Sequence, residues 1–363
     1  MSNLFRSKSG LIVRSADPYN AETPLAQLIS GYITPQSAFY VRSHGEVPQL
    51  DASTHCLRVT GKVQRPLELS IETLRQDFPW RTVNAVMQCA GNRRGDLLQV
   101  APVSGDPWSA GAIGNAEWGG VVLADVLRAA GAVDDTGLHV AFQSLDDCEA
   151  SGERFRFGVS IPMAKAMAPE VLLALEMNGE ALAPAHGFPL RVVVPGFAGV
   201  RSAKWLAEVN VQDQPSDAKP QARDYKLFPP QVREETADWD KGITINEMPV
   251  NAAICEPEPF ADLRTGAVTL RGWAVATARQ VARVDVSTDG GRTWRQAELR
   301  HDFTAPWSWT LWTLQVDLPS GEHELVVRAW DSAGQTQPAL PDDTWNWKGY
   351  LNAAWHRVRV RAT

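Results

Sequence analysis

The first 230 residues combine a helical hydrophobic pattern with short apolar runs. Residues 122–130 form an apolar stretch that ends at Gly131, which predicts a helix stopped by glycine. Residues 170–177 fit a strand or a buried helix, and residues 191–194 predict an interior strand ended by a Pro-Gly pair. The elements do not alternate as regular βαβ units, and no Gly-x-Gly-x-x-Gly or Walker loop occurs. We therefore expect an irregular mixed α/β domain.

Beyond residue 230 the pattern becomes extended throughout. Residues 283–287 alternate, a turn follows at residues 289–291, and residues 292–295 return, which predicts a hairpin. Residues 323–330 and 356–360 read as further strands. Short strands with frequent turns are typical of an immunoglobulin-like sandwich, so the chain as a whole is expected to be α+β.

The distribution of tryptophan and proline along the chain indicates where the boundary between these two parts lies. Of the 14 tryptophans, four precede residue 230 and ten follow it. A polar, proline-punctuated stretch covers residues 212–230 and reads as a linker. We expect a catalytic domain over residues 1–228, with an N-terminal arm over 1–35, and an all-β domain over 229–363. The tryptophans themselves fit core packing better than a ligand cage.

Charge and hydropathy narrow the class of protein. A formal net charge of −7 argues against a general nucleic-acid binder, because phosphate neutralisation needs a surplus of Lys and Arg. No apolar segment is long enough to span a bilayer, and the N-terminus lacks the apolar stretch of a signal peptide. We expect a cytoplasmic protein, or a periplasmic one if the sequence has been trimmed.

Cysteine usage leaves one residue of chemical interest. The cysteines lie far apart and without zinc-finger spacing, which excludes a disulfide framework and disfavours a zinc site: Cys56, Cys89, Cys148 and Cys255. Cys89 is followed closely by Arg93 and Arg94. Neighbouring cations lower a thiol pKa and favour the thiolate that a soft metal or a nucleophile needs. Taken alone, this cysteine could equally be a buried structural thiol beside surface arginines.

Segments far from Cys89 in the sequence favour a functional role for this cysteine over a structural one. Cys-Ala-Gly-Asn-Arg-Arg at residues 89–94 occurs together with His-Gly-Phe-Pro-Leu-Arg at residues 186–191. This combination resembles the sulfite oxidase family of molybdenum–molybdopterin oxidoreductases, in its haem-free bacterial type. The resemblance runs from about Phe39 to residue 358. It implies a molybdopterin-binding domain followed by an immunoglobulin-like dimerisation domain, with Cys89 as the sulfur ligand of molybdenum.

The resemblance also implies which residues hold the cofactor. Arg, Lys and His suit its phosphate, and Arg offers bidentate geometry. Without the motif, His186 would read as a core histidine, and Arg191 and Lys204 as solvated charges. The matched positions are Phe39, Tyr40, Val41, Arg42, Ser43, Asp146, His186, Arg191, Ser202, Ala203 and Lys204.

Positions on the substrate side match as well. The resemblance implies that Arg42 and Arg94 line an oxyanion pocket, that Trp108 forms its aromatic wall, and that Tyr225 lies beside the reacting metal. By residue type alone, Tyr225 could be a linker aromatic. Lys348 stands in Trp-Asn-Trp-Lys-Gly where the family usually has arginine, and lysine keeps the charge but loses the planar fork. Ser43 is a second departure, at a position where asparagine is common.

The activity implied is oxidation of sulfite to sulfate by oxygen-atom transfer, with Arg42, Arg94 and Lys348 holding the anion. The chain shows no haem motif, so electrons are expected to pass to a separate acceptor such as a cytochrome, another carrier or oxygen. Reduction of nitrate, another oxyanion or a sulfoxide at the same type of site is the alternative, and a cofactor-free binding module is a third reading. The family further implies a homodimer.

Overall fold

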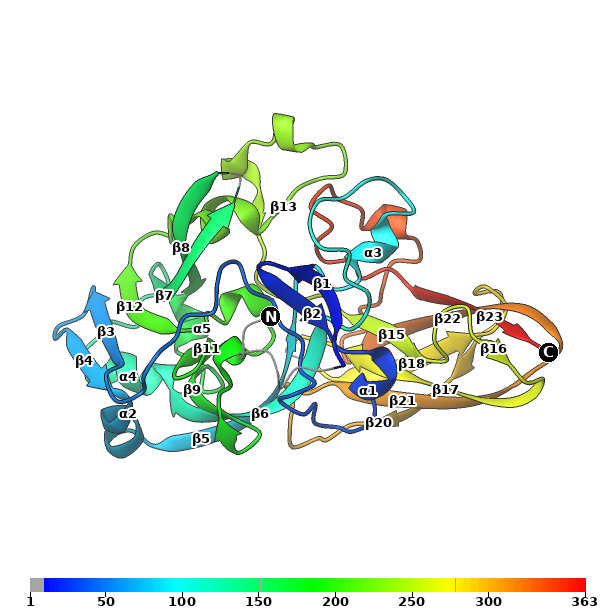
Figure 1. Ribbon diagram of the computed structural model, residues 1–363, viewed down its shortest axis with the longest axis horizontal. Coiled ribbons are helices and arrows are strands. Elements are labelled where there is room, and N and C mark those ends of the chain that lie inside the picture. The colour runs from blue at the N-terminus through cyan, green and yellow to red at the C-terminus, as the bar shows by residue number, and fades with distance from the viewer. Residues whose placement is uncertain (1–9, 151, 278) are drawn as a thin grey trace.

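The computed structural model describes residues 10–150, 152–277 and 279–363. Two β-rich parts lie end to end, with the N-terminal part at one end of an elongated molecule and the C-terminal part at the other (Figure 1). Helices are few and short, so strands carry the architecture. The expected α+β class is confirmed by this arrangement.

Two five-stranded sheets build the N-terminal part. The first has the order β10-β9-β6-β5, with β11 also paired to β9, and comprises β5 (Trp80–Gln88), β6 (Ile113–Val122), β9 (Leu172–Met177), β10 (Glu180–Ala181) and β11 (Arg191–Val193). The second has the order β4-β3-β12-β7-β8 and comprises β3 (Cys56–Gly61), β4 (Leu67–Ser70), β7 (His139–Ala150), β8 (Glu153–Pro162) and β12 (Leu206–Gln212).

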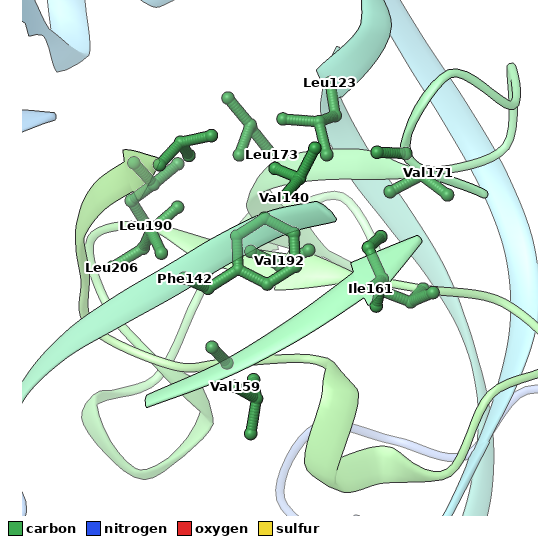
Figure 2. Packing of buried hydrophobic residues seen from close by; sticks show 14 of the residues in the cluster. Leu123, Val140, Phe142, Val159, Ile161, Val171, Leu173, Leu190, Val192 and Leu206 are labelled. Atoms are coloured by element: carbon green, nitrogen blue, oxygen red, sulfur yellow. The ribbon is translucent and has the colours of Figure 1, made fainter. Parts of the chain in front are cut away.

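The core of this part lies between the two sheets. β7 alternates buried and partly exposed residues, so Val140 and Phe142 share its inner face. They pack with Leu173 of β9 and Val192 of β11 in one apolar cluster (Figure 2). β9 is buried along almost its whole length because both of its faces are covered. Of residues 170–177, left open between strand and helix, residues 172–177 form a strand.

Five short α-helices lie among the sheets in the described part of the chain. The helix predicted over residues 122–130 is confirmed as α4, and it ends where Gly131 adopts a φ of +71°. α2 begins at Ser70, whose hydroxyl accepts a hydrogen bond from the Thr73 amide at 3.0 Å. The helices are α1 (Leu25–Leu28), α2 (Ile71–Asp77), α3 (Arg94–Leu97), α4 (Leu123–Ala129) and α5 (Met163–Ala166).

The N-terminal segment bridges the two parts. The hairpin β1 (Ile12–Ala16) and β2 (Tyr19–Glu22) precedes α1, and α1 contributes Leu25 and Leu28 to a cluster with Trp273 of the sandwich. The Tyr32 hydroxyl donates to the Trp309 carbonyl at 2.9 Å. The first nine residues of the expected arm lie outside the described residues. The remainder packs on both parts.

The C-terminal part is a sandwich of two sheets, as the alternating pattern predicted. One has the order β15-β17-β21-β20 and comprises β15 (Asn251–Glu256), β17 (Gly266–Val275), β20 (Glu298–Arg300) and β21 (Thr310–Leu318). The other has the order β16-β23-β22-β18-β19 and comprises β16 (Asp262–Leu263), β18 (Val281–Ser287), β19 (Arg295–Gln296), β22 (Gly321–Asp331) and β23 (His356–Ala362). Trp273, Trp309 and Trp312 are buried, which agrees with core packing.

The stretch between the parts is structured. β13 (Lys226–Leu227) pairs with β14 (Ile243–Thr244), so a strand pair crosses the boundary expected after residue 228, and that boundary stays a prediction. A helical turn, Pro220–Asp224, precedes β13 and buries Pro220 and Gln221. Among the described residues no helix is long and apolar enough to cross a membrane. The cytoplasmic location stays a prediction.

Candidate active site

A cavity opens within the N-terminal part. Its walls come from the end of β5, from residues 39–44, from the segment around β11 and from the stretch before β13. The lining residues are Phe39, Tyr40, Arg42, Ser43, His44, Met87, Cys89, Ala90, Asp146, Phe157, Ala185, His186, Arg191, Gly199, Val200, Ser202, Ala203, Lys204, Trp205 and Tyr225. Most positions predicted to hold the cofactor are thus brought together from segments far apart in sequence.

Cys89 lies directly after β5, on the face of the strand that points into the cavity. Met87 shares that face because residues two apart on a strand project to the same side. The chain turns at once, since the Asn92 amide donates to the Cys89 carbonyl at 2.9 Å. The Gly91 amide points at the Cys89 sulfur at 3.4 Å. A thiol held this way presents its sulfur to the cavity.

The pKa of the Cys89 thiol differs from the expectation. Burial raises the pKa, while Arg94 and Arg42 oppose the rise without cancelling it. The net lowering predicted from the adjacent arginines is therefore wrong, because burial outweighs the attraction of Arg94 and Arg42. Arg93 instead forms an ion pair with Asp96 at 3.0 Å. A buried thiol of this kind becomes a thiolate when a metal displaces its proton.

Three cations line the cavity, together with the carboxyl group of Asp146, which opposes the fall in the pKa of Lys204. Within the described ranges Arg42, Arg191 and Lys204 form no ion pair. Arg191 is buried and donates to the His186 and Ser202 carbonyls at 2.9 Å each. Burial first, and then Arg191, lowers the pKa of Lys204 to about 7. Such a set of positive groups is costly to bury unless an anion joins it.

The residues present fit a molybdopterin cofactor. Its phosphate requires the cations just described, and its pterin ring requires hydrogen-bond acceptors. Asp146 is buried, and its Oδ1 atom has no hydrogen-bond partner in the part of the chain that the structure describes. Burial raises the pKa of Asp146, and Lys204 opposes that rise. A buried acceptor atom without a hydrogen-bond partner can accept a hydrogen bond from an N–H group of a heterocycle such as the pterin ring.

Arg94 sits behind the cavity wall in a cradle of glycines. A Cβ atom on Gly91, Gly105 or Gly349 would lie 2.5–2.8 Å from its side chain, so only glycine fits these positions. Its guanidinium donates to the Lys348 carbonyl and to the Asp106 carbonyl, both at 3.0 Å. It also lies 5.1 Å from the ring centre of Tyr350. Arg94 does not line the cavity, yet its charge reaches Cys89.

Tyr225 lines the cavity beside His44. Its hydroxyl is 2.7 Å from Nε2 of His44, and its ring stacks on Tyr350 with centres 5.1 Å apart. Burial raises the pKa of Tyr225 to about 12, while Arg42 opposes this. Burial also lowers the pKa of His44 well below its usual value. A neutral imidazole and a protonated phenol are thus paired, which suits proton exchange with a bound anion.

Three further positions in the predicted site, besides Arg94, lie outside the cavity lining. Val41 is buried and pairs with Ala21 through its backbone, with amide-to-carbonyl distances of 2.8 and 3.0 Å. Trp108 is fully buried in an apolar cluster with Cys89 and does not reach the cavity wall. The Lys348 ammonium lies 4.5 Å from the Trp347 ring and 5.3 Å from the Trp239 ring, outside the cavity lining. The roles assigned to these side chains stay predictions.

Two residues were missed by sequence reasoning, His44 and Tyr350. His44 follows the segment matched to the cofactor, and Tyr350 follows the Trp-Asn-Trp-Lys-Gly motif. Their importance comes from contacts with Tyr225, which is 181 residues from His44 in sequence. A local pattern carries no signal for such a contact, although proximity to the two motifs marked both as worth inspection.

Comparison with known proteins agrees with this arrangement. Residues 44–219 match the family model of the oxidoreductase molybdopterin binding domain, and residues 243–363 match that of the Mo-co oxidoreductase dimerisation domain. Sulfite oxidase from Gallus gallus is 44% identical over 357 residues, which cover 96% of this chain and 77% of that protein. Sulfite oxidase from Arabidopsis thaliana is 40% identical, covering 97% of this chain and 94% of that protein.

Among solved structures, the sulfane dehydrogenase SoxCD from Paracoccus pantotrophus superposes with a TM-score of 0.81 at 28% identity, covering 96% of this chain and 85% of that one. Fold and site together define a molybdopterin-dependent oxidoreductase. More particularly, the chain belongs to the sulfite oxidase family.

Proposed function

We propose that this enzyme oxidises sulfite to sulfate at a molybdenum cofactor held by Cys89. The observation that carries the proposal is the cavity that the Cys89 thiol shares with Arg42, Arg191 and Lys204, none of which forms a direct ion pair among the described residues. A dianion such as sulfite is attracted to a site of this polarity. The names of the similar proteins from Gallus gallus and Arabidopsis thaliana support the same substrate.

The cofactor would be held by the residues that line the cavity and by the loop after β5. Arg191 and Lys204 would bind its phosphate, Asp146 would accept from its pterin ring, and Cys89 would ligate the metal. Phe39, Tyr40 and His186 would pack around the ring system, while Ser43, Ser202 and Ala203 would supply small polar and backbone contacts. When bound, the cofactor supplies oxygen-atom transfer and the two-electron redox change.

Residues of this chain then act on the substrate. Arg42 and Arg94 stabilise the anion as it approaches, with Arg94 acting from behind the wall. Tyr225 and His44 hold or release a proton at the phenol oxygen. In the net reaction sulfite and water give sulfate, two protons and two electrons, and the electrons leave to a separate acceptor protein or to oxygen. We propose that the charge of Lys348, which lies outside the cavity lining beside the Trp347 ring, helps to attract the anion.

The experiment compares two directions of redox chemistry on one purified preparation. Sulfite with a one-electron dye is assayed against nitrate with reduced viologen, and molybdenum is quantified in the same sample. We expect about one molybdenum per chain and turnover with sulfite. Full metal occupancy with nitrate turnover alone contradicts sulfite oxidation, and a protein without molybdenum from a cofactor-competent host contradicts the enzyme assignment. Cys255→Ala, in the buried sandwich core, serves as a control that keeps activity.

We further propose that the protein is a homodimer joined through its sandwich. The match of residues 243–363 to a dimerisation domain supports this. Sedimentation equilibrium is expected to give twice the chain mass of 39.8 kDa. A purely monomeric species at micromolar concentration contradicts this part of the proposal.

A further inference from the structure

One fully buried arginine has no role in the proposed reaction. Arg201 belongs to the loop whose other members face the cofactor cavity, yet its own side chain does not line it. The loop residues on the cavity wall are Gly199, Val200, Ser202 and Ala203. Arg201 therefore points away from the cofactor, into the protein behind it.

Its hydrogen bonds go to the segment that carries Tyr225. Nε donates to the Ile245 carbonyl at 2.8 Å, and the Ile245 amide in turn donates to the Tyr225 carbonyl at 3.1 Å. Nη1 donates to Oε1 of Gln221, which lies in the helical turn directly before Tyr225. One guanidinium thus braces Tyr225 from both sides of its backbone.

Simple packing does not explain an arginine at this position. In the part of the chain that the structure describes, Arg201 forms no ion pair, and its Nη2 atom has no hydrogen-bond partner. Burial lowers its pKa to about 10, while Tyr225 and Tyr350 oppose the shift. An apolar side chain would fill the same space without this desolvation cost. A rigid fork that joins two segments is what arginine adds.

We propose that Arg201 is a positioning residue that couples the cofactor-binding loop to the placement of the Tyr225 hydroxyl. The inference rests on the proposed function. Ser202 to Lys204 bind one side of the cofactor, Tyr225 faces the reacting centre, and Arg201 ties the two at fixed spacing. A shift of the loop is transmitted to the phenol oxygen, and a misplacement of about 1 Å can cost roughly 100-fold in rate.

A double-mutant cycle on the loaded enzyme tests this coupling. Arg201→Lys keeps the charge but cannot make both bonds, and we expect kcat for sulfite to fall about tenfold, with little change in KM or molybdenum content. In a Tyr225→Phe background the same substitution should cost less than about twofold, because the hydroxyl that it positions is gone. Equal losses in both backgrounds contradict the proposal.

Hydrogen exchange gives a readout independent of activity. In the loaded Arg201→Lys protein, we expect faster exchange at the amides of Tyr225 and Ile245, which donate to Pro220 and Tyr225 in the intact structure. Leu74→Ala, a substitution in the buried face of α2, is the matched control and should destabilise the protein without changing exchange at these amides. Unchanged exchange in Arg201→Lys contradicts the proposal.

A second variant covers the case in which Arg201→Lys does not fold. Gln221→Met removes the acceptor of Nη1 and should lower kcat roughly threefold, less than Arg201→Lys does. In the Tyr225→Phe background the same substitution should leave kcat unchanged. Additive losses contradict the coupling. If the wild-type protein lacks molybdenum, both the proposed function and this inference fail. If it turns over sulfite but the cycle is additive, only this inference fails.

Discussion

Charged side chains are handled in opposite ways at the two ends of the molecule. In the sandwich, the fully buried Asp285 accepts from Arg283 at 2.7 Å and lies 3.3 Å from Arg328, which in turn sits 3.8 Å above the Trp294 ring. In the cofactor cavity, Arg42, Arg191 and Lys204 have neutral acceptors only, as far as the described residues go.

The difference separates charges that stabilise the fold from charges that await a ligand. The sandwich supplies its own carboxylate, so its arginines are neutralised once the chain folds. In the cavity, burial first and then Arg191 lower the pKa of Lys204 to about 7, and Asp146 only partly opposes this shift. Buried charge without an internal partner is a stronger sign of a binding site than positive charge alone.

The largest expected effect comes from comparing substitution of a cysteine in the cavity with substitution of a cysteine in the sandwich. Cys89→Ser should remove the soft ligand and reduce sulfite turnover by more than the roughly 100-fold that loss of an outer-shell partner costs. Cys255→Ala, in the sandwich, should leave turnover within twofold. Metal content per chain and steady-state rates measure both variants. Wild-type rates in Cys89→Ser contradict metal ligation by this residue.

Arginine-to-methionine substitutions sharpen the comparison. Arg191→Met should weaken cofactor retention roughly 100-fold, because a charge-assisted contact to the phosphate is lost. Arg283→Met, half exposed on the sandwich, should leave retention unchanged. Cofactor retention is measured by gel filtration of each variant, after which the released pterin is oxidised and quantified by its fluorescence. Equal cofactor retention in both variants contradicts the distinction between arginines of the cavity and arginines of the sandwich.

Removing the internal partner tests the sandwich. Asp285→Asn leaves Arg283 and Arg328 without a carboxylate, and we expect the free energy of unfolding to fall by about 2 kcal/mol, less than for a fully buried pair because Arg283 is half exposed. Molybdenum content should not change. Urea denaturation of the loaded protein measures the first quantity. An unchanged midpoint contradicts a stabilising role for the ion pairs.

The smallest effect concerns acid sensitivity. Burial lowers the pKa of His356 to about 4, and its Nδ1 accepts from the Ile254 amide at 3.1 Å. The unfolded chain therefore binds an extra proton between about pH 4 and 6.5, so stability falls as pH falls through this window. From pH 7 to 5 the wild type should lose about 2 kcal/mol more than His356→Asn, which keeps the acceptor. His323→Asn, at an exposed bond to Pro319, is the control.

Much of the fold followed from local patterns. The 122–130 helix, the 191–194 strand and the sandwich hairpin after residue 287 were predicted because periodicity and turn residues are local signals. The cavity positions around His186 and Arg191 were predicted from the paired motifs. The direction of the Lys348 side chain, the burial of Trp108 and the contact between His44 and Tyr225 were not, because each depends on segments brought together by the sheets. The net pKa of Cys89 was missed because burial is a tertiary property.

The most direct test of the central claim is an anomalous diffraction map of crystals of the loaded protein at the molybdenum edge. The account predicts one anomalous peak per chain within bonding distance of the Cys89 sulfur, with phosphate density in reach of both Arg191 and Lys204. A fully loaded protein whose peak lies away from Cys89, or whose phosphate contacts neither cation, contradicts it.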